Sequence, residues 1–200
     1  MSTLPRGIVY DTSTLLRSAD SRRSVGGIAD ELRRWLCGKS APRRWRNAHT
    51  IAHDWAQQNS CEPLVEVRAH CPQVHVVFDP EHLRRLLVNL LDNALRYASG
   101  TPGCICVATL PVGLHRVRLS VWSDGHPLDA GVRRHLFEPF FSSESRSSGL
   151  GLYICRQLCE RYGAHIAYQR SLLDQREGNE FTVDLPRVNS LAANLDPAAH

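Results

Sequence analysis

The chain has 200 residues, which is enough for one domain of ordinary size with extensions, and 42% of them are hydrophobic. It contains no run of about eighteen apolar residues and no apolar signal core behind its first basic residue. This excludes a membrane-spanning segment from the expected structure, and we expect a soluble, cytoplasmic protein. The seven cysteines form no Cys-x-x-Cys pair, which favours reduced, mostly buried thiols over a metal site.

Charge is spread unevenly along the chain. Residues 1–50 hold ten Lys and Arg against four Asp and Glu, whereas residues 51–200 hold fourteen against sixteen. A basic arm can contact nucleic acid or a membrane surface. This arm lacks the aromatic residues that single-strand binders place among their basic ones. We therefore interpret residues 1–44 as a poorly ordered, solvated linker with one short helix, and we expect no nucleic-acid partner.

Hydrophobic periodicity and turn residues predict an alternation of hairpins and helices. We expect a domain over residues 45–187 with its core in 60–187, and a disordered tail over 188–200. The predicted helices are Ile28–Leu36, Trp45–Gln58, Pro80–Ala98, Val132–Phe137 and Leu150–Tyr162. The predicted strands are Pro63–Ala69, Val74–Phe78, Cys104–Leu110, Leu114–Trp122, Ala164–Arg170 and Glu180–Leu185. This order predicts an α+β fold, a two-layer sandwich with helices on one face of a mixed sheet.

The helix predicted to start at Pro80 has the clearest signals. Asp79 is placed to cap it, Pro80 takes the first helical position, and leucines recur along one face. Beside that apolar face, a polar stripe collects His82, Arg85, Asn89, Asn93 and Arg96, with Tyr97 at its border. An amide oxygen is a suitable hard ligand for Mg²⁺, and an arginine can contact a phosphate.

Two histidines on the preceding helix, His49 and His53, are four residues apart and could bind zinc together. No third ligand or Glu-containing pattern accompanies them. We therefore favour ordinary surface or packing histidines.

A serine-rich stretch, residues 142–148, lies between two phenylalanines and a Gly-x-Gly. Such a stretch cannot bury itself, so it predicts a mobile, solvated loop. Gly149 and Gly151 then open a helix, whose free N–H groups and dipole favour an anion. The alternative is a tight turn with no ligand.

These motifs together resemble the ATP-binding catalytic domain of bacterial sensor histidine kinases, in the GHKL superfamily with DNA gyrase. Leu86–Tyr97 resembles the N box of that family, Leu136–Phe141 its F box, and Gly149–Ile154 its G2 box. Residues 142–160 look most like the sensor kinases that control type IV pilus genes. The resemblance covers about residues 60–187 and implies the Bergerat (GHKL ATPase) fold with ATP and Mg²⁺ as cofactors.

The resemblance also implies roles for individual residues. Asn93 would bind Mg²⁺, and Gly125 would lie beside the adenine. The other nucleotide-binding residues implied are Asn89, Arg96, Tyr97, Ser123, Gly149, Leu150, Gly151 and Leu152. The ATP lid would include Phe137, Phe140, Phe141 and Arg146.

The first glycine box departs from the family pattern Asp-x-Gly-x-Gly, whose Asp accepts a hydrogen bond from the adenine amino group. Aligned on Gly125, Ser123 occupies the Asp position and Pro127 the later Gly position. Asp124 is adjacent, but a shift of one residue on a strand turns the side chain to the other face. A neutral hydrogen bond in place of a charged one predicts a loss of roughly tenfold in ATP affinity.

The phosphoacceptor motif of a sensor kinase, His-Glu/Asp-x-x-Thr/Asn-Pro, has no match. His53-Asp54 comes nearest, but no proline completes it. We therefore expect no catalytic histidine in this chain, and expect that the γ-phosphate of ATP goes to a dimerisation and phosphoacceptor segment outside it, with a response regulator as the further partner.

Two other functions remain open. A degenerate, non-catalytic module that docks a partner would fit Ser123, Pro127 and the missing acceptor. A Ser/Thr kinase of the anti-sigma-factor kind would be expected to carry a Glu four residues before the metal-binding Asn. That position is Asn89, which cannot serve as a general base and so favours the histidine-kinase interpretation.

Overall fold

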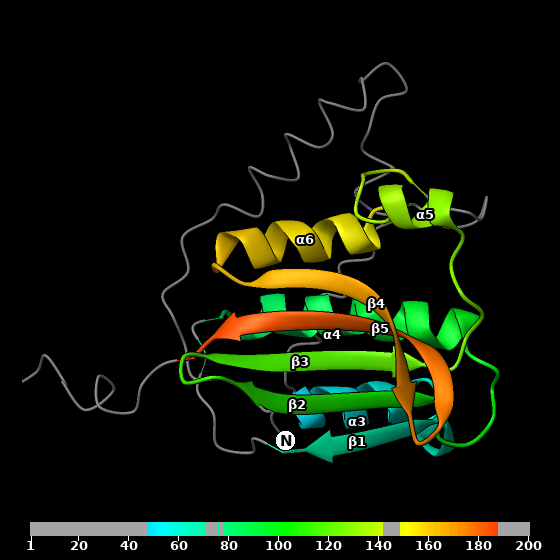
Figure 1. Cartoon of the computed structure of the whole chain (residues 1–200). Helices are drawn as coiled ribbons and strands as arrows, with labels where there is room; N and C mark the ends of the chain where they lie inside the picture. The colour runs from blue at the N-terminus through cyan, green and yellow to red at the C-terminus, as the bar shows by residue number, and fades with distance from the viewer. Residues whose placement is uncertain (1–47, 71–75, 77, 142–148, 188–200) are drawn as a thin grey trace, which may run out of the picture.

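The computed structural model describes residues 48–70, 76, 78–141 and 149–187, which form a five-stranded sheet with α3, α4 and α6 packed against it (Figure 1). The strands are β1 (Val65–Ala69), β2 (Ile105–Val112), β3 (Arg116–Ser123), β4 (His165–Leu173) and β5 (Arg176–Pro186). The helices are α3 (Ala48–Gln58), the 3-10 turn η1 (Glu62–Leu64), α4 (Pro80–Tyr97), α5 (Ala130–His135) and α6 (Gly151–Arg161).

The strand order is β1-β2-β3-β5-β4. β1 pairs with β2 in parallel, through a crossover that contains α4, and the other neighbours are antiparallel. The mixed sheet and its helix layer confirm the predicted α+β fold. The expected short helix at Val132–Phe137 is displaced by two residues, to α5.

Helix α4 begins and ends where the sequence predicts. The Asp79 carboxylate accepts hydrogen bonds from the backbone N–H groups of Glu81 (2.9 Å) and His82 (3.2 Å), and Pro80 takes the first turn. Its apolar face is fully buried in the core, and the residues that form it are Leu83, Leu86, Leu87, Leu90, Leu91 and Ala94. Trp55 of α3 donates from Nε1 to Asp92 of α4 at 2.9 Å, which joins α3 to the same layer.

Helix α6 ends at a glycine, as expected. Gly163 has φ +63°, and its N–H bonds to Glu160 O while the N–H of Ala164 bonds to Cys159 O. This is the Schellman pattern, in which a left-handed residue lets the chain leave the helix with its last carbonyls satisfied. The following residues enter β4 directly.

The β4–β5 hairpin is longer and tighter than predicted. The sequence suggested strands ending at Arg170 and starting again at Glu180, but the pairing continues to a turn at Asp174 and Gln175. Both turn residues have positive φ, 49° and 65°, which is the geometry that matches the twist of a two-residue hairpin. Apart from the two turn residues, the stretch between 170 and 180, predicted as a polar hairpin, therefore consists of paired strand.

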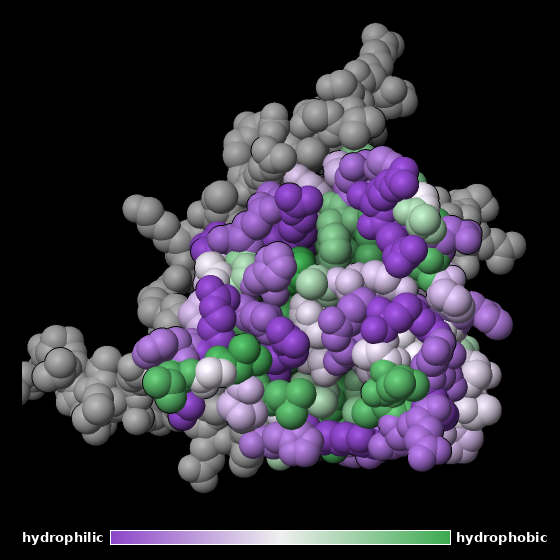
Figure 2. Space-filling view, viewed as in Figure 1, coloured by the Kyte–Doolittle hydropathy of each residue, from purple (hydrophilic) through white to green (hydrophobic). Residues whose placement is uncertain are grey.

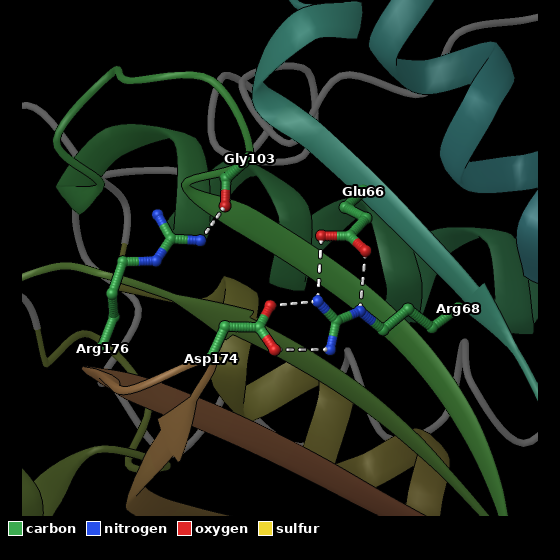
Figure 3. Close-up of polar contacts among 5 residues, drawn as sticks. All are labelled: Glu66, Arg68, Gly103, Asp174 and Arg176. Carbon is green, nitrogen blue, oxygen red and sulfur yellow. Dashed lines mark hydrogen bonds and ion pairs between the residues drawn. The ribbon is translucent and has the colours of Figure 1, made fainter.

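The end of this hairpin curls across the outer face of the sheet, the face away from the helices, and reaches the opposite edge (Figure 1). Arg68 of β1 makes ion pairs with Glu66 and with Asp174 of the hairpin turn, and Arg176 donates to the carbonyl of Gly103 at 2.9 Å (Figure 3). Trp122, on the outer face of β3, is only 2% exposed as a result. The hairpin thus forms a cover over the sheet.

The rest of the outer face is mostly hydrophilic, with apolar residues in separate patches (Figure 2). The five cysteines in the described part of the chain are free and buried, as expected. Among the described residues, no helix is both long enough and apolar enough to cross a membrane.

Several expectations concern residues outside the described part. These are the arm and helix of 1–44, the tail of 188–200 and most of the strand at 74–78. Of that strand, Val76 forms an isolated antiparallel bridge with Arg187, and Phe78 is buried.

Candidate functional site

The polar stripe of α4 meets the start of α6 at Asn89. A β-carbon on Gly151 would lie 3.5 Å from Asn89 Oδ1, so the first turn of α6 is in direct contact with this amide. The Asn89 Nδ2 group is buried and has no hydrogen-bond partner among the described residues. Leaving a buried amide donor unpaired costs about 1–3 kcal/mol. The amide is therefore a donor that an incoming acceptor would satisfy.

Cys155 of α6 also contacts Asn89. Its thiol is fully buried and donates weakly to the carbonyl of Leu86 at 3.6 Å. Burial raises the pKa of Cys155 strongly, and its interaction with the Asn89 amide opposes this only in part. The thiol stays protonated, and sulfur is only a weak acceptor, so its contact does not replace an oxygen partner for Asn89 Nδ2.

Gly149 brings together the two ends of the predicted lid. It has φ +63°, and a β-carbon there would lie 2.6 Å from the carbonyl carbon of Phe140 and 2.8 Å from the backbone of Phe141. Phe140 itself has φ 63°, which is uncommon for a non-glycine residue. No larger residue fits at Gly149 without moving this junction. Arg146 and the rest of 142–148 lie outside the described residues.

The phenylalanines of the F box anchor the near end of the lid. Phe137 packs edge-on against Phe181 of β5, with ring centroids 6.4 Å apart. The Phe141 ring lies 5.5 Å from that of His135, which in turn pairs with Glu138 at 3.0 Å. The predicted lid therefore begins directly after a segment that packs on the sheet.

The far end of α4 meets the turn after β3. A β-carbon on Gly125 would lie 2.5 Å from the carbonyl oxygen of Tyr97, so only glycine allows this approach. Asn89 and Tyr97 are eight residues apart on α4, which separates the two junctions by about 12 Å. Half-buried Asn93 lies between them, and Arg96 is exposed in the last turn. This span is comparable to an extended nucleoside triphosphate.

Asp124 follows the last residue of β3 and is engaged by the turn after α4. Its carboxylate accepts hydrogen bonds from the N–H (2.9 Å) and hydroxyl (2.7 Å) of Ser99, and Arg176 lies 4.0 Å away. The carboxylate holds the turn after α4. It therefore cannot replace the missing Asp at Ser123.

Ser123 is the last residue of β3 and is 5% exposed, on the same face as the buried Val121. Three residues that the sequence analysis missed surround the turn that follows it: Tyr168 and Arg170 on β4, and Asn179 on β5. Extending the alternation of Phe181 and Val183 back along β5 would have placed Asn179 on the helix-facing side.

His49 and His53 belong to no cluster of metal-ligand side chains among the described residues. His49 bonds through Nε2 to Thr109 Oγ1 at 3.2 Å, burial lowers its pKa, and His53 is exposed. Within the described ranges, no three His, Cys, Asp or Glu side chains come together as a metal site would need.

Comparison with known proteins shows which family this chain matches. Residues 78–189 match the family described as histidine kinase-, DNA gyrase B-, and HSP90-like ATPase. The sensor protein kinase PilS of Pseudomonas aeruginosa is 41% identical over 95 residues, covering 46% of this chain and 18% of that protein. The sensor histidine kinase ZraS of Klebsiella oxytoca is 34% identical over 108 residues, covering 54% of this chain and 22% of that protein. The chain spans about a fifth of the length of these relatives.

Solved structures agree on the fold. The mycobacterial sensor histidine kinase MprB superposes with a TM-score of 0.61 at 22% identity, covering 74% of this chain and 98% of that one. The nucleotide-free catalytic domain of histidine kinase ThkA gives a TM-score of 0.60 at 23% identity, covering 74% of this chain and 97% of that one.

Proposed function

The chain belongs to the family of histidine kinase-, DNA gyrase B- and HSP90-like ATPases, and from this premise we propose how its residues bind ATP and pass on a phosphoryl group. It carries the ATP-binding catalytic domain of the sensor histidine kinases. The domain we propose spans residues 45–187, because α3 packs its buried face into the common core.

The observation that carries the proposal is the unpaired, buried Nδ2 of Asn89 at the start of α6. A phosphate oxygen is the acceptor it lacks. Helix α6 begins at Gly151 without a side-chain cap, and the helix dipole at this end favours an anion. We assign the triphosphate to this junction, and Leu150 and Leu152 supply its apolar backing.

Asn93 lies in the position that the family uses for Mg²⁺. The fit rests on its donor chemistry, since an amide oxygen shared with phosphate oxygens and water suits this ion. When bound, Mg²⁺ neutralises charge on the triphosphate. Asn93 would hold it, Arg96 would contact the phosphates, and Tyr97 and Gly125 would lie towards the base. Acceleration would then come from positioning and charge, not from a covalent step.

The acceptor we propose is a histidine on a separate dimerisation and phosphoacceptor segment, with a response regulator receiving the phosphoryl group next. Because the reaction consumes ATP, we place it in the cytoplasm. The resemblance of residues 142–160 to the kinases of type IV pilus regulation makes that pathway our first choice.

A non-catalytic docking module is the second candidate, and Ser123 in the Asp position favours it. A Ser/Thr kinase is the third and is less favoured, because Asn89 stands where such an enzyme would have its general base.

Titration of the purified chain with a fluorescent ATP analogue, with and without Mg²⁺, separates the first two candidates. We expect saturable binding that Mg²⁺ strengthens. If no saturable binding occurs at millimolar nucleotide, only the docking module is left. If binding occurs, transfer of labelled phosphate to a phosphoacceptor domain, but not to a variant without its histidine, identifies the kinase.

A further inference from the structure

Polar residues form one row across three neighbouring strands at the base end of the site. Ser123 of β3 is the registered partner of Asn179 on β5, and Asn179 is the partner of Arg170 on β4. Partners in an antiparallel pair point to the same face. Ser123 and Asn179 are each 5% exposed, in line with the apolar residues of the helix-facing side. We call Ser123, Asn179 and Arg170 the polar row.

The polar row holds the turn after β3 by its backbone. Arg170 Nη1 donates to the carbonyl of Gly125 at 2.9 Å, and Asn179 Nδ2 donates to the carbonyl of His126 at 2.9 Å. Asn179 Oδ1 accepts from the Tyr168 hydroxyl (2.8 Å) and from Arg170 (3.2 Å). Asn179 thereby makes two hydrogen bonds through Oδ1 and one through Nδ2, and these hold the turn against the end of α4.

The charge of this region differs from that of an Asp-containing site. The polar row contains no carboxylate, and both carboxylate oxygens of the neighbouring Asp124 accept hydrogen bonds from Ser99. The charged member is the cation Arg170, which also pairs with the exposed Glu177 at 3.4 Å. Ser123 therefore offers a neutral hydroxyl where the family has an acceptor-only carboxylate.

We propose that the polar row gives this site little preference between adenine and guanine, so that it binds ATP and GTP with similar affinity. The proposal rests on the nucleotide-binding function proposed above. A carboxylate accepts from the amino group of adenine and repels the carbonyl of guanine at the same ring position. A hydroxyl can accept a hydrogen bond from the adenine amino group or donate one to the guanine carbonyl.

The test measures affinity for ATP, GTP and inorganic tripolyphosphate, each with Mg²⁺, by NMR titration of the purified chain. We expect ATP and GTP to differ by less than about fivefold, and both to bind at least about tenfold more tightly than tripolyphosphate. Ser123→Asp should shift the ratio towards ATP by at least about tenfold. Ser123→Ala should weaken both nucleotides by about three- to tenfold and leave their ratio unchanged.

Gln169→Ala is the matched control. Gln169 is next to Arg170 but faces outward and bonds to Glu180 at 2.7 Å, so the ATP-to-GTP ratio should not change. A strong adenine preference in the wild-type chain would overturn this proposal alone. So would equal affinity for both nucleotides and tripolyphosphate, because the base would then make no contribution. If Ser123→Asp does not fold, an unaltered affinity in Ser123→Ala overturns it. Absence of any binding overturns the proposed function as well.

Discussion

Gly178 of the β4–β5 hairpin lies directly against the indole of Trp122 on β3. A β-carbon at residue 178 would be 2.2 Å from Cε2 and 2.4 Å from Cζ2 of that ring. Arg176 lies over the same ring, with its guanidinium carbon 5.3 Å from the centroid. This contact lets the hairpin that carries Arg170 and Asn179 fold over the sheet.

Gly178→Ala should therefore destabilise the domain by about 1–3 kcal/mol, because the added methyl group overpacks a buried ring. Chemical denaturation measures the change. In a Trp122→Leu background the same substitution should cost much less, and this double-mutant cycle isolates the contact. Equal costs in both backgrounds would assign the effect to the backbone.

Asn89→Leu should leave the nucleotide-free domain as stable as the wild type, or more stable by about 1 kcal/mol, because it removes a buried unpaired donor. Nucleotide binding should weaken at least about tenfold. Thermal unfolding and ATP titration report the two effects separately. A loss of stability with unaltered binding would show that the amide serves the fold.

Asn93→Ala should abolish the Mg²⁺-dependent part of ATP binding, because it removes the proposed metal ligand. Circular dichroism should show an intact fold, since Asn93 is only half-buried. Arg84→Ala, exposed on the same helix, is the control and should bind as the wild type does. Binding that still depends on Mg²⁺ in Asn93→Ala would assign the metal to another residue.

Gly149→Ala should weaken nucleotide binding and destabilise the domain by about 1 kcal/mol or more, because residue 149 has positive φ and touches the backbone of Phe140 and Phe141. Gly131→Ala on α5 provides the control, since a β-carbon there meets nothing within 4 Å. ATP titration and thermal unfolding of both variants would test the expectation. If Gly149→Ala and Gly131→Ala have similar ATP affinity and stability, the junction at residue 149 adjusts to the added methyl group.

The stability of the domain should fall in acid, because the Asp184 carboxylate becomes protonated there and loses its ion pair. This carboxylate makes a two-point hydrogen-bonded pair with Arg118 (2.7 and 2.8 Å), which lowers the pKa of Asp184 below its ordinary value of 3.8. The pair contributes its full stability above about pH 4, and the contribution is lost as pH falls below 3.8 through the folded-state pKa. Asp184→Asn should lower stability at neutral pH and flatten this part of the pH profile measured by denaturant unfolding.

Local chemistry was enough to predict the elements that carry the proposed phosphate site. Asp79, Pro80 and the leucine spacing predict α4 because capping and amphipathic periodicity act within a few residues. Gly163 predicts the end of α6 for the same reason. The resemblance of three motifs, in order, then points to the fold and to ATP. The family match agrees with both, and the solved structures agree with the fold.

Only the tertiary structure decided which residues gather at the base end of the proposed site. Asn179 and Arg170 follow Ser123 by some fifty residues in sequence. Because β5 inserts between β3 and β4, Asn179 becomes the neighbour of Ser123 and Arg170 the neighbour of Asn179. The direction of Asp124 depends likewise on Ser99, at the far end of another element. Polar strand residues have no local signal that distinguishes a solvated loop from a buried row, since strand pairing between distant segments makes that distinction.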